Sequence, residues 1–455
     1  MFLLTSQDGS RRFSRTVFHA LVALGALGAL VTPVRAGAQA VAASPPALRL
    51  GPVLDAVERA NPRLDAARAV ARAARARVPS VTRPPDPQLQ LGWMNFEVPS
   101  LRPMETTGMT QLQLMQMVPV AGKLKLAGAV ETTRADATAT RVAEVSFDLR
   151  VRTSMVFYDL YATDGALGVA RETRRLLQDI EQIAGRMYQV GEGRQADVLR
   201  AGVELARMQE EIIRMETMRT AMAARLNALL VQNADAMVGA PQLPVFLAEP
   251  PSLDSLTQLA LQNRPMLRAG AQDVESAEAA ARLARREIWP DLQLGAQLGR
   301  QPGLGGGQSM ASLMVGASLP VFAKSRQLQM REEADAMRAM AAADLASMRT
   351  ETRGAAAVAH ADLMRARRLA DLYRTAVLPQ AEATVTSSLS AYRVGTVNFM
   401  TLLDAQMTLN RYREELFTLE ADEGKAWAEL EMLTGRVLVD AHTARPARPS
   451  GGSPK

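Results

Sequence analysis

Few side chains in this sequence are suited to chemistry. Cysteine is absent, and the three histidines, His19, His360 and His442, lie far apart in the chain. A catalytic centre needs a nucleophile beside a base, or several metal ligands at close spacing, and neither pattern is present. The acidic residues alternate with arginine at helical spacing, which is typical of a solvated helix face. The sequence therefore predicts no enzyme activity, no cofactor and no bound metal ion.

Methionine is the one abundant candidate ligand, with 24 residues. Thioethers bind soft ions such as those of copper and silver. Met208, Met215 and Met222 recur every seven residues, however, and at such positions methionine is packing material. A second group surrounds a predicted hairpin and is interpreted as lipid-facing or loop side chains rather than ligands: Met94, Met104, Met109, Met115 and Met117.

The first forty residues differ from the rest. Three arginines, Arg11, Arg12 and Arg15, precede an apolar run over residues 17–31, and the sequence AQA at 38–40 fits the small-residue rule of signal peptidase. We expect residues 1–40 to be a secretory signal. A membrane anchor is the alternative, although the run is shorter than the ~20 residues of a spanning helix.

The remaining chain is nearly neutral, with 49 basic and 46 acidic residues in 41–455. This balance gives no basic stripe for nucleic acid. No further apolar run reaches the ~18 residues that suggest a transmembrane helix. Without cysteine there is neither a disulfide nor a site for an N-terminal lipid. If the protein lies in a membrane, its fold must place it there.

An internal duplication organises the chain. Four short sequences recur in the same order at spacings of 203, 203, 201 and 204 residues, which is a strong signal of repeated structure. They are NPRL at 61–64 with RPML at 264–267, PQLQLG at 87–92 with PDLQLG at 290–295, VPV at 118–120 with LPV at 319–321, and YQVG at 188–191 with YRVG at 392–395.

Each repeat contains a helix, a β-hairpin and two long helices in that order. We expect the first repeat at 41–232, with its hairpin at about 88–118 and long helices at about 122–188 and 195–232. The second repeat is expected at 253–438, with its hairpin at about 290–320 and long helices at about 325–392 and 398–435. Residues 233–252 form a proline-rich linker, and 439–455 are expected to be a disordered tail.

The predicted strands alternate apolar and polar residues. Leu292, Leu294 and Leu298 share one face of the third strand, whereas the first hairpin changes phase near Met94 and Met115. A β-bulge in each strand of that hairpin would restore a single apolar face. Strands of about ten residues are long enough to cross a bilayer when tilted, although a small soluble hairpin is equally consistent with this pattern.

The long helices favour an elongated molecule. Residues 122–188 contain no proline, and 67 residues at ~1.5 Å each make a rod of roughly 100 Å. Sustained heptads over 198–229 and 402–433 predict coiled-coil packing between neighbouring helices. One charged residue interrupts each heptad seam, and we hypothesise that these two, Arg219 and Glu423, pair; the alternative is that each faces water or a lumen.

Four strands are too few to close a barrel, and an open sheet edge cannot face lipid because its N–H and C=O groups would remain unpaired. Other copies of the chain must then complete the sheet. A trimer would supply twelve strands around a water-filled lumen. The predicted fold is therefore mainly α-helical, with a homotrimeric twelve-stranded transmembrane β-barrel and an α-helical coiled-coil tunnel.

This duplicated order resembles the TolC family of outer membrane efflux proteins over about residues 48–438. The resemblance rests on PPDPQLQLGWMNFEVPS, MVPVAGKLKLAG, YQVGEGRQADVLRA and YRVGTVNFMTLLDAQMTL. It implies a homotrimer in the outer membrane of a Gram-negative bacterium, extending into the periplasm. It also implies a passive exit duct for small molecules or metal cations, docked through a periplasmic adaptor onto an inner-membrane resistance–nodulation–division pump. PDPQL and the P..GK pattern resemble the heavy-metal cation branch.

In this family the two YxxG turns form the inner end of the tunnel, where the adaptor docks. Asp197 follows the first turn, and Thr401 stands at the equivalent place in the second repeat, where an acidic residue is common in the family. The expected tip residues, carried over position by position, are Tyr188, Gly191, Gly193, Asp197, Leu199, Tyr392, Gly395, Leu403 and Asp404. Ordinary turn chemistry without a partner is the alternative for these residues, and a soluble periplasmic coiled-coil scaffold or adaptor is the alternative for the whole chain.

Overall fold

The computed structural model describes residues 47–95, 97–100, 104, 108–301 and 307–444. The chain divides into two units, Met1–Ser44 and Pro45–Lys455. The helices and strands given below belong to the second unit. The expected secretory signal, residues 1–40, lies outside the described residues.

The first repeat contains four helices. A short strand, β1 (Leu48–Arg49), leads into α1 (Leu50–Ala60) and α2 (Pro62–Val81), followed after the hairpin by α3 (Lys123–Gln189) and α4 (Gln195–Leu229). Asn61 separates α1 from α2 and caps α2 by accepting a hydrogen bond from Arg63 N, and Pro62 takes the first helical position. The 67 residues of α3 form one uninterrupted helix, as the absence of proline requires.

The second repeat follows the same order. After β4 (Pro241–Gln242) in the linker come α5 (Leu253–Asn263) and α6 (Pro265–Arg286), then the second hairpin, and then α7 (Gln327–Leu372), α8 (Leu378–Arg393) and α9 (Phe399–Thr434). The helix expected at 325–392 is interrupted by a π-helical turn at Tyr373–Val377. Pro379 explains this turn, because proline lacks the N–H that a continuous α-helix needs at that position.

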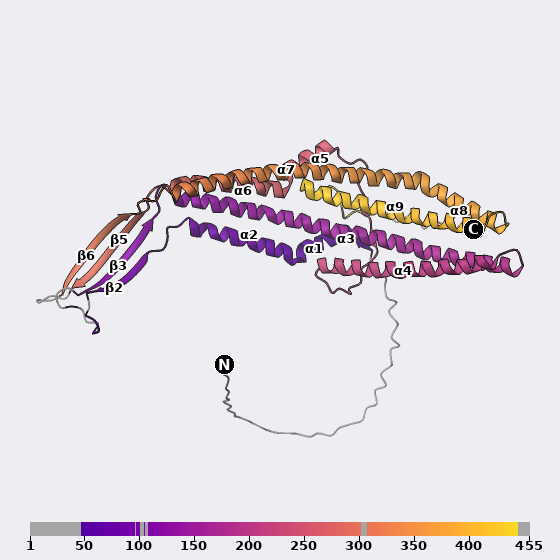
Figure 1. Ribbon diagram of the computed structural model, residues 1–455, viewed down its shortest axis with the longest axis horizontal. Coiled ribbons are helices and arrows are strands. Elements are labelled where there is room, and N and C mark those ends of the chain that lie inside the picture. The colour runs from indigo at the N-terminus through magenta and orange to yellow at the C-terminus, as the bar shows by residue number, and fades with distance from the viewer. Residues whose placement is uncertain (1–46, 96, 101–103, 105–107, 302–306, 445–455) are drawn as a thin grey trace, which may run out of the picture. The chain divides into compact units, whose positions relative to one another are not determined.

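The two hairpins join in one antiparallel sheet. It contains β2 (Gln88–Met94), β3 (Met109–Val118), β5 (Leu292–Gln301) and β6 (Gln308–Ala317) in the order β2-β3-β5-β6. Figure 1 shows β2 and β6 as the outermost strands. The central pair, β3 with β5, joins the first repeat to the second.

The bulges expected in the first hairpin are absent. Pairing of β2 with β3 runs in unbroken register from Gln88 opposite Met115 to Met94 opposite Met109. The change of phase has two other causes. At Asn95 the strand ends, with a left-handed φ of 53°, and Met115 and Met117 lie on the sheet face opposite the leucines.

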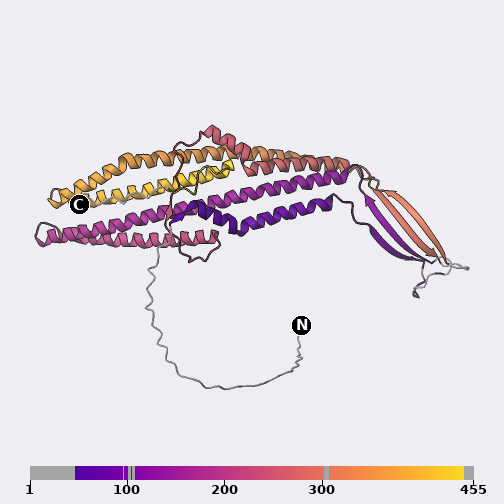
Figure 2. The ribbon, with the colours of Figure 1, turned by 180° about the vertical axis from the view of Figure 1, so that it is seen from behind.

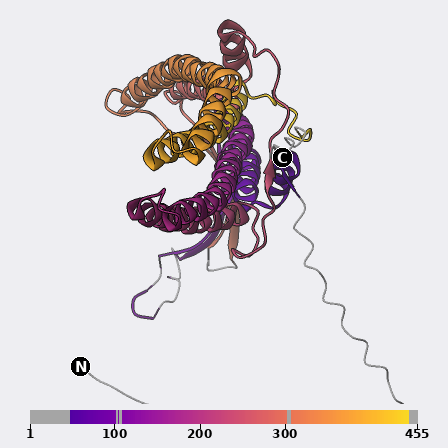
Figure 3. The same ribbon diagram turned by 90° about the vertical axis from the view of Figure 1, so that its right-hand side faces the viewer.

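The long helices lie side by side in one layer, and α5 lies outside it (Figure 1). Helix α3 packs against α2, α4, α6 and α9, and α7 packs against α6 and α9. Figure 2 shows the same arrangement from behind, and Figure 3, which looks along the helices, shows that the layer is curved. Near the sheet the order is α2-α3-α6-α7, so the layer ends at α2 and α7 as the sheet ends at β2 and β6.

Burial is uneven across this layer. The first half of α7, up to Asp344, contains no buried residue, and Leu328, Met330, Met337 and Met340 are exposed there. Helix α2 buries only Leu64 and Ala71. The inner helices α3 and α9 each bury 19 residues. Among the described residues, no helix combines the length and apolarity needed to cross a membrane.

The hypothesis that Arg219 pairs with Glu423 is wrong for a single chain. The Arg219 guanidinium binds Asp164 of α3, with Nε 2.6 Å from Oδ1, and donates to Val238 O at 3.0 Å. Glu423 pairs instead with Arg367 of α7 at 3.5 Å. Each charge therefore has a neighbouring helix as its partner, because α3 and α7 lie nearer to these seams than the seams lie to each other.

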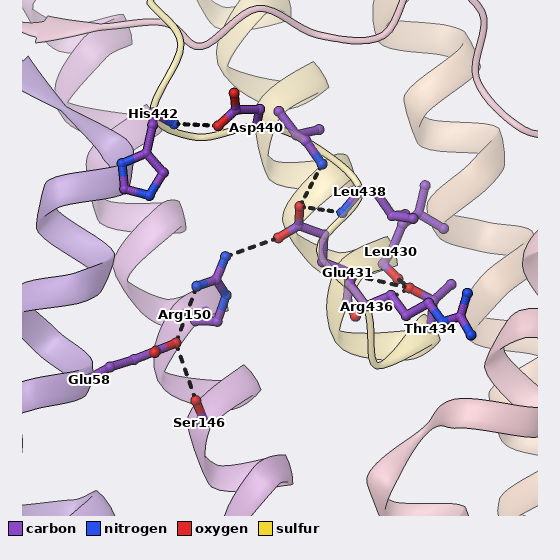
Figure 4. A network of polar contacts seen from close by, with 11 residues as sticks. Glu58, Ser146, Arg150, Leu430, Glu431, Thr434, Arg436, Leu438, Asp440 and His442 are labelled. Atoms are coloured by element: carbon purple, nitrogen blue, oxygen red, sulfur yellow. Dashed lines mark hydrogen bonds and ion pairs between the residues drawn. The ribbon is translucent and has the colours of Figure 1, made fainter.

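The expected tail at 439–455 is partly wrong, because residues 439–444 are packed against the helices. Val439 is buried, Ala441 O accepts a hydrogen bond from Gly51 N at 2.9 Å, and Pro244 bridges to Ala444. Glu431 of α9 anchors the start of this segment by accepting hydrogen bonds from the N–H groups of Leu438 and Val439, each at 2.9 Å (Figure 4).

Glu431 also belongs to a charged network. Its carboxylate lies 3.7 Å from Arg150 of α3, and Arg150 in turn contacts Glu58 of α1 at 3.2 Å (Figure 4). Burial raises the pKa of Glu431 above the usual carboxyl range, and the two backbone N–H groups and Arg150 oppose this only in part. The folded protein therefore retains the Glu431 proton at pH values where the unfolded chain has lost it.

The substitution E431Q tests this charge state. A raised pKa means that the wild-type free energy of unfolding falls as the pH rises from about 4.5, the reference value, through the pKa of the folded state. Glutamine has no proton to lose, so the melting temperature of E431Q minus that of wild type should be larger at pH 7 than at pH 4. Thermal unfolding in detergent at the two pH values measures this difference, and a pH-independent difference would contradict it.

Candidate functional site

The two expected tip turns have the same backbone geometry. In the α3–α4 turn, Gly191 N donates to Tyr188 O at 3.1 Å and Glu192 N to Met187 O at 2.9 Å. In the α8–α9 turn, Gly395 N donates to Tyr392 O and Thr396 N to Ala391 O, both at 3.0 Å. Gly191 and Gly395 take left-handed φ values of 79° and 73°, which glycine adopts without steric cost.

The helices after these turns begin differently. Asn398 caps α9, because its Oδ1 accepts hydrogen bonds from both the N–H and the hydroxyl of Thr401, at 2.9 and 3.0 Å. The equivalent residue before α4 is Arg194, which forms no side-chain cap, and Asp197 instead supplies a carboxylate in the first turn. Thr401, which stands where an acidic residue is common in the family, thus has a structural role, since its hydroxyl completes the cap of α9.

The tyrosines of the two turns lie in different environments. Tyr188 is about half exposed, whereas Tyr392 is buried in an apolar cluster and meets the Phe399 ring edge-on at 6.0 Å between ring centroids. Burial raises the pKa of the Tyr392 phenol, and the nearby Asp197 carboxylate raises it further. The cluster that buries Tyr392 also contains Ile180 of α3 and Ala201 of α4, so helices from both turns contribute to it.

The remaining expected residues also divide by exposure. Leu199 is exposed, but Leu403, its equivalent 204 residues later, is buried in the same cluster as Tyr392. Asp404 is exposed and lines two grooves of about 480 Å³ each, one between α4 and α9 and one between α8 and α9. The expected residues that are exposed at the tip are therefore Tyr188, Gly191, Leu199, Gly395 and Asp404, whereas Gly193 and Asp197 are half-buried.

Sequence analysis missed two tip residues. Val190 and Val394 occupy the third position of the two YxVG sequences and are 70% and 73% exposed. A valine on each turn, directly before a left-handed glycine, presents an apolar side chain to solvent. Their equivalent positions in the duplication could have identified them, because an apolar residue repeated at a helix reversal has no core to enter.

The two faces of the sheet differ in chemistry. The register places leucines together on one face: Leu89, Leu91, Leu112, Leu114, Leu292, Leu294, Leu298 and Leu313. This face is exposed, and Leu313 reaches 88%. The other face carries Gln90, Gln111, Gln113, Gln293 and Gln297, and Gln297 donates to Gln111 across β3 and β5. One face is therefore apolar and the other is rich in side-chain amides.

Methionines share the glutamine face and lie opposite the leucines, so the two kinds of apolar side chain do not form one surface. Met115 and Met314 both pair with Gly295, from opposite sides. A Cβ on Gly299 would lie 3.1 Å from Met109 Sδ, and Met310 stands opposite the same glycine. The two glycines leave room for thioether side chains to lie over β5. In the part of the chain that the structure describes, no group of three or more His, Cys, Asp or Glu side chains is placed to hold a metal ion.

Known proteins are similar to this chain in sequence. Residues 256–436 match the family model described as outer membrane efflux protein. Over 318 residues, which cover 68% of this chain and 72% of the relative, the sequence is 25% identical to the cobalt-zinc-cadmium resistance protein CzcC of Cupriavidus metallidurans. The second repeat thus matches the outer membrane efflux protein family, and the longer alignment with CzcC extends the similarity to both repeats. The predicted resemblance to the TolC family and its CusC/CzcC branch is confirmed.

Solved structures share the fold. CusC matches with a TM-score of 0.74 and 17% identity, covering 85% of this chain and 92% of CusC. VceC of Vibrio cholerae matches with a TM-score of 0.73 and 16% identity, covering 86% of this chain and 96% of VceC. MtrE of Neisseria gonorrhoeae matches with a TM-score of 0.72 and 16% identity, covering 86% of this chain and 89% of MtrE. The predicted fold class, long helices with a strand portion, is confirmed. The family model, the CzcC relative and the shared fold together support an outer membrane channel of a tripartite efflux system over the alternative of a soluble scaffold.

The tip glycines differ in what a side chain would meet, and this predicts unequal effects of two matched substitutions. A Cβ on Gly193 would lie 2.8 Å from Tyr188 N, but one on Gly191 would meet no atom within 4 Å. G191A should therefore cost only the ~1–2 kcal/mol of a left-handed alanine. G193A should open the turn and release the amides bonded to Met187 O.

Hydrogen exchange of a peptide covering residues 186–197 measures this effect. Exchange in G193A should be about tenfold faster than in G191A, which corresponds to roughly 1.4 kcal/mol. The α8–α9 turn, which neither substitution touches, is the internal control. Equal exchange in the two variants would show that the turn accommodates a side chain at Gly193.

Proposed function

We propose that this channel works as a homotrimer, in which neighbouring copies complete one β-barrel and one helical tunnel. The observation that carries the proposal is the pair of open edges. Strands β2 and β6 end the sheet, α2 and α7 end the helical layer, and α2 leads into β2 as β6 leads into α7. One edge of both layers thus belongs to the first repeat and the other edge to the second, so head-to-tail contacts between copies close a ring.

The two sheet faces support an orientation within this ring. The leucine face would contact lipid, and the face of glutamines, glycines and methionines would line the water-filled lumen. Amide side chains hydrogen-bond water without adding charge, which suits passive exit of varied solutes. The mature protein would reach the outer membrane after removal of residues 1–40 and, having no cysteine, without a lipid anchor.

We further propose that the duct serves a resistance–nodulation–division pump through a periplasmic adaptor, and that its cargo is metal cations. The name of the relative CzcC supports this cargo. Small molecules are the other cargo class, and sensitivity tests separate the two. Cells lacking the protein should lose resistance to cobalt, zinc or cadmium, whereas loss of resistance only to organic compounds would contradict a metal cargo.

The oligomeric state tests the ring directly. Protein extracted in detergent should have three times the mass of the processed chain by size-exclusion chromatography with light scattering. Extraction should require detergent, because the leucine face is otherwise exposed to water. A single-chain species that stays dispersed in plain buffer would contradict both the trimer and the barrel.

The exposed valines predict how the adaptor docks. V190D and V394D should each weaken the complex with the adaptor, because a carboxylate would replace an apolar contact at the tip. Each variant should reduce co-purified adaptor about tenfold or more, which is an interface loss of roughly 1.4 kcal/mol. V437D is the matched control, since Val437 is also an exposed valine but lies beyond the end of α9.

A cysteine crosslink complements this measurement. The exposed residue Glu192 is the better site, because a Cβ at Gly193 would collide with the backbone of Tyr188. E192C should form a crosslink with the adaptor in cells. Undiminished adaptor recovery with V190D and V394D, together with no crosslink from E192C in an active system, would place docking elsewhere.

A further inference from the structure

A buried lysine joins the two repeats where the sheet meets the helices. Lys123 Nζ lies 2.9 Å from Asp291 Oδ1 and 3.4 Å from Glu287 Oε2, and it donates to Trp289 O at 2.8 Å. Its side chain is only 7% exposed. Lys123 begins α3 directly after β3, and its three partners lie between α6 and β5. The lysine therefore clamps the junctions on either side of the β3–β5 pair.

The duplication gives Lys123 a counterpart. The sequence VPVAGK at 118–123 corresponds to LPVFAK at 319–324, so Lys324 is the equivalent lysine in the second repeat. It lies between β6 and α7. Lys324 is exposed, and its side chain forms no hydrogen bond or ion pair with any described residue. The same residue at the same junction is thus buried and paired in one repeat but unpartnered in the other.

The partners of Lys123 also have counterparts. The segment 287–291 before β5 corresponds to 84–88 at the start of β2, because PDLQLG and PQLQLG are 203 residues apart. Asp86 stands at the position of Trp289, whose carbonyl binds Lys123. It is the only acidic residue in this segment and is exposed, with no polar partner for its side chain among the described residues.

Lys324 and Asp86 lie beside opposite edges of the sheet. Lys324 follows β6, Asp86 precedes β2, and both β3 and β5 separate these strands. Four strands at ~4.8 Å spacing place the two edges about 14 Å apart. Between copies the situation differs, because a contact of β6 with the β2 of a second copy would repeat the contact of β3 with β5.

We propose that Lys324 of each subunit pairs with Asp86 of the next copy, as an intersubunit version of the Lys123 clamp. This inference rests on the proposed trimeric ring. Three clamps within subunits would then alternate with three between subunits around the junction of barrel and tunnel. The intersubunit clamp has one carboxylate instead of two, because Gln88 replaces Asp291 and Pro84 replaces Glu287. It is therefore the weaker and more salt-sensitive of the two.

A cysteine pair tests this contact in the full-length chain. The natural protein has no cysteine, so a disulfide in the variant D86C/K324C involves only these two positions, and the single variants report pairs of like positions. In the trimer, mild oxidation should give covalent dimers and trimers on non-reducing gels, and reductant should abolish them. The single variants D86C and K324C should remain monomeric on the same gels.

Charge reversal provides a second measurement. K324D and D86K should each lower the melting temperature of the trimer by about 2–5 °C, and the double variant K324D/D86K should recover at least half of this loss. K125D is the matched control, because Lys125 is an exposed lysine near the start of α3 without a side-chain partner among the described residues. It should leave the trimer unchanged.

The outcomes separate the clamp from the ring. A trimer by light scattering that gives no crosslink in D86C/K324C, and no rescue in K324D/D86K, would overturn the clamp and leave the ring intact. A wild-type protein that is not trimeric would overturn the proposed assembly and the clamp with it. Crosslinking together with rescue is the result that we expect.

Discussion

The architecture depends on the unpaired edges of a four-stranded sheet. The outward-facing backbone N–H and C=O groups of β2 and β6 have no partner strand among the described residues, and lipid offers none. The helical layer also has an exposed apolar edge, because the first half of α7 contains no buried residue and leaves Leu328, Met330, Met337 and Met340 exposed. Both deficits lie on the same two sides of the molecule, since α2 continues into β2 and β6 into α7. A second copy placed on either side would satisfy the hydrogen bonds of the sheet and the apolar surface of the helices together.

Duplication explains how one chain provides both halves of such a contact. The central joint between repeats, formed by β3 with β5 and α3 with α6, is completed within the chain. In the proposed ring, the outer edges would form the same joint between two copies. Lys123 shows the difference, because it is buried between carboxylates at the inner joint, whereas its counterpart Lys324 is exposed. A repeat would then encode this contact twice, once within the chain and once as a surface.

The sequence predicted those features that repeat or that follow a strict period. The absence of proline over 122–188 predicted one long helix, and α3 covers 67 residues. Alternation predicted the leucine face of β5. Prediction failed where a residue's role depends on its neighbours in space. The bulges near Met94 and Met115 were inferred because methionine was assumed to belong with leucine, but Gly295 and Gly299 make room for it among the glutamines. Arg219 and Glu423 were matched by their position in each repeat, although Asp164 and Arg367 lie closer. Residues 439–444 lack any periodic pattern, and Glu431 orders them through two backbone N–H groups.

The two tip turns have the same backbone conformation but differ in the side-chain contacts that hold them. Both are closed by the same pair of backbone hydrogen bonds. In the second repeat, side chains add to these bonds, because Tyr392 packs on Phe399 within a buried cluster and Asn398 caps α9. In the first repeat Tyr188 is about half exposed and Arg194 provides no cap. The α3–α4 turn therefore has fewer side-chain contacts than the α8–α9 turn, and it relies instead on one additional backbone hydrogen bond, from Gly193 N to Met187 O at 2.9 Å. In a ring, the two kinds of turn would alternate, and each subunit would present one of each kind to its partner.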